Sequence, residues 1–171
     1  ITASDAILEA SPGETLALIG GDIDLDFVSL LAPGGQIDIG AVADTTIEVD
    51  NSSIGLSVDV PGAFSGQSIR IIDSEITTYP EDFGDTGNLE IVGGTATISS
   101  SYLEASTDDG NAGNLVIEVT DTLTIDDFSE LYSDVLFGIG TGGDLQISAA
   151  SALIRDSILQ SSAGEGDAGN L

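Results

Sequence analysis

The chain of 171 residues contains 30 Asp or Glu but only two basic residues, Arg70 and Arg155, so its formal net charge is −28. Such a surface repels nucleic acids and anionic lipids, and it excludes both as partners because they bind through clustered Lys and Arg. The chain has no Cys and no His, which excludes thiolate metal sites and Cys–His or Ser–His nucleophiles. No apolar run approaches the ~18 residues that a membrane span needs.

The apolar residues predict an all-β fold. They make up 41% of the chain, and its mean hydropathy of +0.26 is too high for a disordered chain. Small and β-branched side chains supply most of them, and 22 glycines suit short strands joined by tight turns. Nowhere do apolar residues recur with the i, i+3, i+4, i+7 spacing of a helix.

The first half of the chain contains the earliest predicted strands. Residues 15–21 read Thr-Leu-Ala-Leu-Ile-Gly-Gly, and residues 32–40 read Ala-Pro-Gly-Gly-Gln-Ile-Asp-Ile-Gly, a turn followed by a strand. Residues 69–71, Ile-Arg-Ile, repeat the alternation of residues 37–39, so we expect both segments to occupy the same slot in different turns. Residues 74–78 are then the later strand of that turn.

The second half of the chain repeats one signature: Gly, two residues, Gly, Asn or Asp, Leu. It occupies residues 84–89, 110–115, 140–145 and 166–171, so successive starts lie 26, 30 and 26 residues apart. We interpret the longer interval as a loop insertion of four residues. A period of this size is typical of a solenoid, in which each turn stacks on the one before.

Three short strands follow one another in each repeat. Alternating apolar residues mark the first strands at 89–91, 115–117 and 145–147, the second at 96–98, 123–125 and 153–154, and the third at 101–106, 129–133 and 157–161. This pattern predicts a three-sided parallel β-helix. We expect about six to seven turns in one continuous solenoid, with no linker between them.

Residues 13–42 also carry a family resemblance. The segment Thr-Leu-Ala-Leu-Ile-Gly-Gly, followed by Ala-Pro-Gly-Gly-Gln-Ile, resembles the haemagglutination-activity domain of filamentous-haemagglutinin-like exoproteins, which are exported by two-partner secretion. The cyanobacterial type is the most similar, and residues 84–171 resemble the repeats that follow this domain. The resemblance implies a right-handed β-helix in a secreted or cell-surface filament. It makes residues 1–49 the end of the haemagglutination-like region and residues 50–171 its continuation, in a segment of a longer chain with an export signal upstream.

The polar residue before each repeated Leu is predicted to form a structural ladder. Equivalent positions of a solenoid lie above one another, so their side chains can hydrogen-bond from turn to turn where the chain bends. These positions explain the shape of the protein and not an activity. They are Asn88, Asn114, Asp144 and Asn170.

Acidic residues in the loops are candidate calcium ligands. Hard cations take six to eight oxygen ligands, and stacked loops could pool carboxylates from adjacent turns. The candidates are Asp82, Asp85, Asp108, Asp109 and Asp167. Thr141 interrupts this acidic column, and the alternative is a set of solvated loops that attract divalent ions only weakly. No other cofactor is expected.

The function that best fits these features is that of a non-catalytic, adhesin-like rod on a cell surface or outside the cell. Its partner would be a glycan, a surface or a matrix component. A self-assembling extracellular fibre, stacked end to end, is the alternative, and a polysaccharide-degrading enzyme is a weaker one because no Lys or His is available as a base. Aromatic residues exposed on one side would form a sugar-stacking or protein-docking face. Those considered are Phe64, Tyr79, Phe83, Tyr102, Phe128, Tyr132 and Phe137.

Overall fold

The computed structural model describes residues 1–43, 48–52, 55–59, 65–80 and 83–171, with side chains in 1–43, 66–80 and 83–171. This part contains 20 strands and no helix, which confirms the predicted all-β class. The strands are β1 (Thr2–Glu9), β2 (Thr15–Gly20), β3 (Ile23–Leu31), β4 (Gln36–Ala43), β5 (Glu48–Ser52), β6 (Gly55–Asp59), β7 (Ser65–Gly66), β8 (Ser68–Ile72), β9 (Glu75–Thr77), β10 (Leu89–Gly93), β11 (Thr95–Ser99), β12 (Tyr102–Glu104), β13 (Leu115–Val119), β14 (Thr122–Asp126), β15 (Glu130–Tyr132), β16 (Val135–Ile139), β17 (Leu145–Ser148), β18 (Ser151–Ile154), β19 (Ile158–Gln160) and β20 (Ala163–Glu165).

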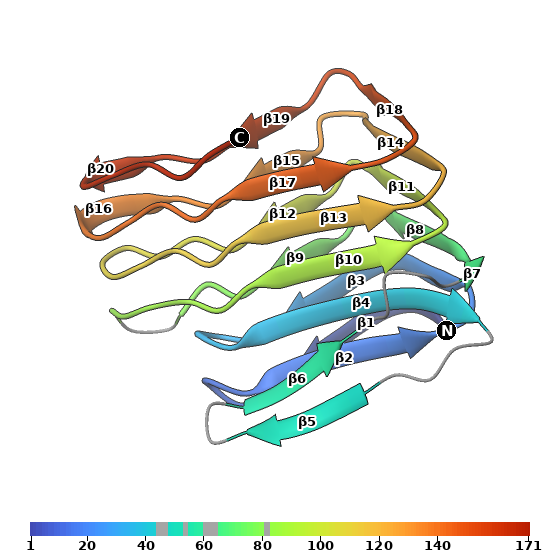
Figure 1. Ribbon diagram of the computed structural model, residues 1–171, viewed down its shortest axis with the longest axis horizontal. Coiled ribbons are helices and arrows are strands. Elements are labelled where there is room, and N and C mark those ends of the chain that lie inside the picture. The colour runs from blue at the N-terminus through green and yellow to red at the C-terminus, as the bar shows by residue number, and fades with distance from the viewer. Residues whose placement is uncertain (44–47, 53–54, 60–64, 81–82) are drawn as a thin grey trace.

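The strands form successive turns that stack on one another (Figure 1). In the described part, six turns begin with β1, β3, β8, β11, β14 and β18, and each of these strands pairs in parallel with the next. The ten-stranded sheet contains these strands, and β2, β4, β10, β13 and β17 run through the six-stranded sheet. The arrangement is consistent with a parallel β-helix.

The register confirms most of the predicted repeat. Leu89 pairs with Leu115, and Leu115 with Leu145, while Ile37 pairs with Leu89 one turn earlier. The slot predicted for residues 69–71 is wrong, because Ile69 pairs with Ile23 on one side and with Ala96 on the other. These residues therefore belong to the second strand position of their turn.

An insertion explains this error. Between β4 and β8 the chain forms the antiparallel hairpin β5–β6 and the short strand β7, and β6 lies beside β2 (Figure 1). Strand β4 therefore pairs directly with β10, and β3 pairs directly with β8. Strands on both sides of residues 49 and 50 thus share the same sheets.

The four extra residues of the 30-residue interval are not in one loop. The pairing of Leu115, Leu123 and Leu131 with their neighbours in the adjacent turns places one extra residue before β14 and one at the corner before β15. The other two lie between Val135 and Ile139 of β16, where the pairing with β20 shifts register. None of the four lies in a paired strand of the two main sheets. The apolar rows therefore stay aligned through the longest turn.

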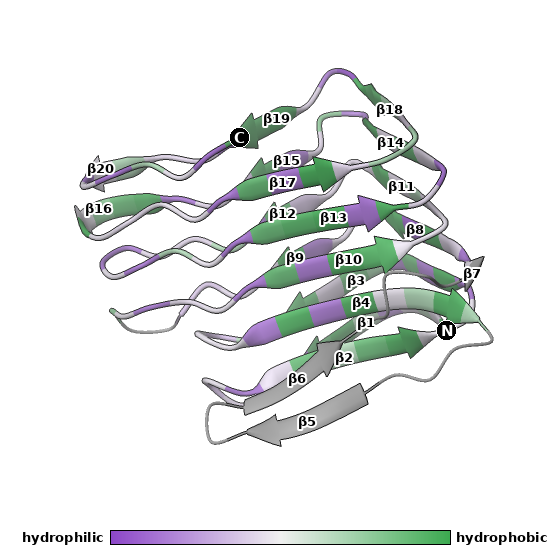
Figure 2. Cartoon of the chain, viewed as in Figure 1, coloured by the Kyte–Doolittle hydropathy of each residue, from purple (hydrophilic) through white to green (hydrophobic). Residues whose placement is uncertain are grey.

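The core lies between the two main sheets and consists of stacked aliphatic side chains. The inward-facing residue of β9, β12 and β15 is Ile76, Leu103 and Leu131 in turn, and each is fully buried. Figure 2 shows the same alternation of apolar and polar residues along the strands. Each such side chain contributes about 1.5–3 kcal/mol of burial free energy, so the rows supply the main stabilisation.

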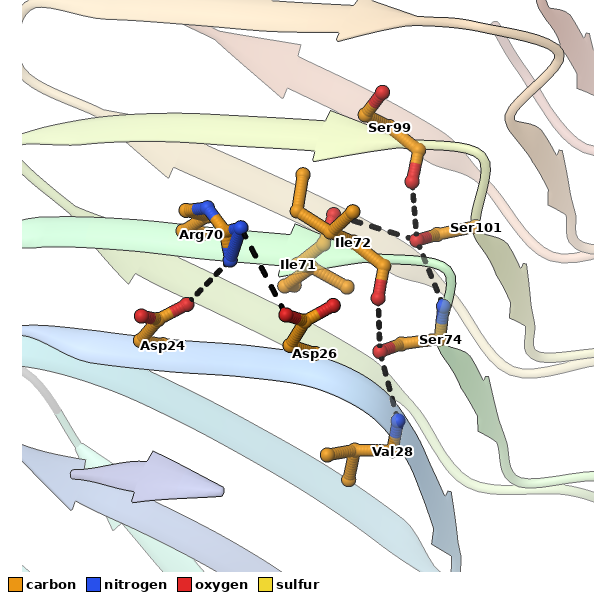
Figure 3. Close-up of polar contacts among 9 residues, drawn as sticks. All are labelled: Asp24, Asp26, Val28, Arg70, Ile71, Ile72, Ser74, Ser99 and Ser101. Carbon is orange, nitrogen blue, oxygen red and sulfur yellow. Dashed lines mark hydrogen bonds and ion pairs between the residues drawn. The ribbon is translucent and has the colours of Figure 1, made fainter. Parts of the chain in front are cut away.

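A buried row of serine hydroxyls follows the corner that bends the ten-stranded sheet (Figure 3). The Oγ of Ser74 accepts the N–H of Val28 at 3.0 Å and donates to the carbonyl of Ile72 at 2.7 Å. Ser101 repeats this arrangement one turn later, where it accepts the N–H of Ser74. Ser129 continues the row. Backbone groups that do not pair with a neighbouring strand at the corner are therefore hydrogen-bonded to serine hydroxyls.

The second glycine of each signature allows the turns to approach closely. A Cβ added at Gly113 would lie 1.9 Å from the carbonyl oxygen of Gly87, and a Cβ at Gly143 would lie 2.0 Å from that of Gly113. No side chain fits in this column, because the backbone of the previous turn already occupies the space. The spacing of the turns at the loop side therefore requires glycine.

Candidate binding face

Two tyrosines and two glutamates alternate on the outer face of β12 and β15. Tyr102 and Glu104 lie on β12, where they pair in register with Glu130 and Tyr132 of β15. The two tyrosine rings therefore meet diagonally, with their centroids 5.6 Å apart and their planes at 48°. The residues between them on each strand point inward to the core, which fixes all four side chains outward.

Hydrogen bonds along each strand join a tyrosine to a glutamate. The hydroxyl of Tyr132 donates to Oε2 of Glu130 at 3.1 Å, and Tyr102 bonds to Glu104 in the same way. Burial raises the pKa of both tyrosine hydroxyls, and their glutamate partners raise it further. The hydroxyls therefore stay protonated as donors at physiological pH.

Glu104 is the most buried glutamate of this face, at 9% exposure. Burial raises the pKa of Glu104, and hydrogen bonds from Tyr102, Thr77 and Ser106 oppose that shift. The Oγ1 of Thr77 donates to Oε2 of Glu104 at 3.3 Å. Glu104 is thus held in place by three donors from its own and a neighbouring turn.

A shallow hollow of about 300 Å³ opens beside these residues. Asp134 lines it and is only 1% exposed. Its Oδ2 accepts Nε2 of Gln160 at 2.6 Å, while its Oδ1 has no hydrogen-bond partner among the described residues. We call this site the tyrosine–carboxylate hollow, and its lining residues are Tyr102, Glu104, Glu130, Tyr132, Asp134, Leu136 and Gln160.

Both arginines lie away from the hollow, Arg70 on β8 and Arg155 directly after β18, and both are paired across turns. Nη1 of Arg70 lies 2.7 Å from Oδ1 of Asp24 (Figure 3), and Nη2 of Arg155 lies 2.9 Å from Oδ2 of Asp126. Neither arginine lines the tyrosine–carboxylate hollow. The electrostatic character of the hollow therefore comes from its carboxylates.

The predicted ladder residues lie in one column along the loop side of the six-stranded sheet. The Oδ1 of Asn88 accepts the backbone N–H of Asn114 at 2.9 Å, and Oδ1 of Asn114 accepts that of Asp144 at 2.8 Å. Asn170 donates to Asp144 through its backbone at 2.7 Å and through its side chain at 2.9 Å. These bonds lower the pKa of Asp144. The ladder is mostly side chain to backbone.

The four predicted calcium ligands that lie in the described residues make separate contacts and form no metal-binding group there. Oδ1 of Asp85 accepts the backbone N–H of Asn111 at 2.7 Å and its side-chain N–H at 3.0 Å. Oδ1 of Asp109 accepts the backbone N–H of Ile139 at 3.1 Å. Tyr79 hydrogen-bonds to Asp108, while Asp167 is exposed in the last loop.

Asp82 lies outside the described residues. Among the residues that are described, no group of three or more acidic side chains is arranged to hold a metal ion. Calcium binding stays a prediction, to be tested in solution.

The candidate aromatic residues do not gather on one face. Tyr102 and Tyr132 meet in the hollow, whereas the side chains of Phe83, Phe128 and Phe137 are about four-fifths exposed elsewhere on the surface. Tyr79 is half-buried in a loop, where burial and Asp108 raise its pKa to about 12. The side chain of Phe64 lies outside the described part.

Five of the seven lining residues were not predicted from the sequence as site residues, and three of these five are acidic: Glu104, Glu130 and Asp134. Their signal is positional, because each lies two residues from a tyrosine on the same outward face. Asking which polar residues share a face with an outward aromatic residue would have found them.

The chain was compared with protein-family models, curated proteins and solved structures, and none of them matches it. In the described part, no helix is long and apolar enough to span a membrane. The haemagglutinin-like resemblance and the expected secretion therefore stay predictions.

Proposed function

We propose that this chain is a segment of a secreted, adhesin-like rod that binds a surface or matrix partner without catalysis. The observation that carries the proposal is the tyrosine–carboxylate hollow, which lies on the side of the stack and not at its ends. A site in this position stays open when turns are added above and below it. A rod can therefore present such a site at a distance from the cell.

The finer fold belongs to the same proposal. We take the stack to be a right-handed, three-sided parallel β-helix, in which the ten-stranded sheet supplies two sides by bending at its corner. Long β3 supports this, because its residues 23–26 pair with β8 and its residues 29–31 pair with β9. Phe27 between them has a φ of 54°, which turns the strand.

Rigidity along the stack suits an adhesive role. Backbone ladders, the serine row and the asparagine ladder all join one turn to the next. Pulling the stack apart would break these bonds together. Weak contacts from several such sites on a long rod would add up to firm attachment.

A hydrolase is the competing function that one observation favours. Burial raises the pKa of Glu104, as the general acid of a glycosidase requires. Its three hydrogen-bond donors already engage the carboxylate, which supports a binding role instead. Release of reducing ends from a polysaccharide, lost in Glu104→Gln, would replace the non-catalytic proposal with a hydrolase.

The proposal is tested by coating beads with the chain and measuring their retention on cells and on polysaccharide-coated glass under flow. The control is a bead coated with an unrelated folded protein of similar net charge. We expect selective retention of the coated beads. Retention no greater than the control, together with filaments of the chain in the electron microscope, would favour the self-assembling fibre.

A further inference from the structure

Four outward-facing threonines form a regular array on β11 and β14, which lie one above the other in the stack (Figure 1). Thr95 and Thr97 lie on β11, and Thr122 and Thr124 lie on β14. Thr97 pairs directly with Thr124, and the same register places Thr95 beside Thr122. The residues between them on each strand are buried in the core. We call these four residues the threonine array.

Strand geometry fixes the spacing of the array. Residues two apart on a parallel strand are separated by about 6.6 Å, and residues on neighbouring strands by about 4.8 Å. The branched side chain of threonine restricts its rotation, so hydroxyl and methyl groups recur in a grid with these two spacings. Ser68 and Ser151 extend one column of the grid by one turn in each direction, because they pair with Thr95 and Thr122.

The hydroxyl groups of the threonine array are not used within the protein. Hydroxyl groups of loop threonines are: those of Thr78, Thr86 and Thr107 all donate to backbone carbonyls. In the part of the chain that the structure describes, no hydroxyl group of the array makes such a bond. Three of the four side chains are fully exposed, and Thr124 is half-buried. These hydroxyl groups can therefore hydrogen-bond to a ligand at no cost to the fold.

The surroundings of the array favour a neutral ligand. The chain carries 30 Asp or Glu, yet the two columns that contain the array have no carboxylate from β8 to β18. Their one charged residue is Arg70, which pairs with Asp24 at the edge. The columns also contain no aromatic ring that could pack against the apolar face of a sugar. Their outward residues are Ser68, Arg70, Thr95, Thr97, Thr122, Thr124, Ser151 and Leu153.

We infer that the threonine array binds ice. Water molecules on a crystal face of ice form a neutral lattice that repeats in two directions, at distances close to the two spacings of the array. Each threonine hydroxyl can both donate and accept a hydrogen bond, as lattice water does. The paired strands hold the hydroxyl groups in place before binding, so little order has to be gained on contact. The array lies on other strands than the tyrosine–carboxylate hollow, and this inference does not rest on the adhesive function.

The test is the growth of ice in a solution of the whole chain. A single crystal is held just below its melting point under the microscope, where it grows as a round disc if no solute binds its faces. We expect flat facets in the presence of the chain. Ice grown slowly from the same solution is then melted, and we expect it to contain more of the chain than the remaining liquid.

Matched variants assign the effect to the array. Thr97→Tyr places a bulky side chain in the grid and holds the ice surface away from the other threonines. We expect at least about tenfold less of this variant in the ice, because several hydrogen bonds are lost together. Ser148→Tyr makes a similar change at an exposed position of β17 in the six-stranded sheet and should behave like the unmodified chain. Thermal melts check that both variants are folded.

Three results would overturn the inference. Round crystals with the unmodified chain would show that the array does not bind ice. Equal facets with Thr97→Tyr would place ice binding on another surface. Round crystals together with adsorption to cellulose that Thr97→Tyr abolishes would make the array a site for a neutral glycan.

Discussion

The hydroxyl group of Ser101 accepts the backbone N–H of Ser74 across one turn of the stack, at a distance of 3.1 Å. It also donates to the carbonyl of Ser99 at 2.8 Å, so one side chain joins its own turn to the previous one. Both serines are buried. The N–H of Ser74 is thus shielded from water, and the hydroxyl of Ser101 is its hydrogen-bond partner.

Removing this hydroxyl should destabilise the protein. Ser101→Ala leaves the N–H of Ser74 buried without a partner, at a cost of about 1–3 kcal/mol in the free energy of unfolding. Ser151→Ala, at an exposed position of β18, is the control and should change stability by less than about 0.5 kcal/mol. Urea unfolding measures both. Equal effects of the two substitutions would show that the serine row adds nothing.

The glycine column gives a second prediction. Gly113→Ala places a Cβ against the carbonyl oxygen of Gly87, and relieving this clash requires the backbone of one turn to move. We expect a loss of about 1–3 kcal/mol or more in the free energy of unfolding. At Gly21 an added Cβ meets nothing within 4 Å, so Gly21→Ala is the matched control. If both variants unfold at the same urea concentration, close approach of the turns does not explain the repeated glycine.

Stability should depend on pH through Glu104. Burial raises its pKa above the ordinary value of 4.5, so the folded state holds this proton more tightly than the unfolded state does. The resulting stabilisation is present below pH 4.5 and is lost as the pH rises through the raised pKa. Glu104→Gln should therefore be more stable than the unmodified chain near neutral pH and lose this advantage in acid.

The control for that experiment is Glu118→Gln, which removes a charge from an exposed position of β13. Its unfolding midpoint should follow the unmodified chain over the same pH range. A gain for Glu118→Gln as large as for Glu104→Gln would assign the effect to the overall negative charge. The burial of Glu104 would then have no measurable consequence.

Calcium is tested by thermal melts in EDTA, in millimolar calcium and in a monovalent salt of matched ionic strength. The net charge of −28 predicts stabilisation by any salt, because screening weakens the repulsion among carboxylates. Oδ1 of Asp85 and of Asp109 already accepts backbone N–H groups, so we expect equal gains in both salts. A clearly larger gain in calcium would indicate an ordered site in the acidic loops.

The sequence predicted the features that repeat and missed those that vary. Leu89, Leu115 and Leu145 could be aligned because every turn must fill the same core position. The slot of Ile69 was predicted wrongly because the hairpin β5–β6 interrupts the period before it. Only the pairing of β8 with β3 and β11 shows that residues 68–72 occupy the second strand position of their turn.

The hollow could not be found from the repeat for a related reason. Its column of outward residues reads Thr77, Glu104, Tyr132 and Gln160 in successive turns. These side chains do not face the core, so packing does not restrict their type. Each turn carries a different residue at this position, and the sequence shows no repeat there. The tyrosine–carboxylate contacts depend on diagonal neighbours that only the register reveals.

The account is tested most directly by the retention of coated beads under flow when the two tyrosines of the hollow are replaced. The double variant Tyr102→Ala, Tyr132→Ala should lose most of its retention while still melting cooperatively, because it keeps the stack and loses the binding face. Phe128→Ala removes another exposed aromatic ring outside the hollow and should be retained like the unmodified chain. Full retention of the double variant would contradict adhesion through the hollow.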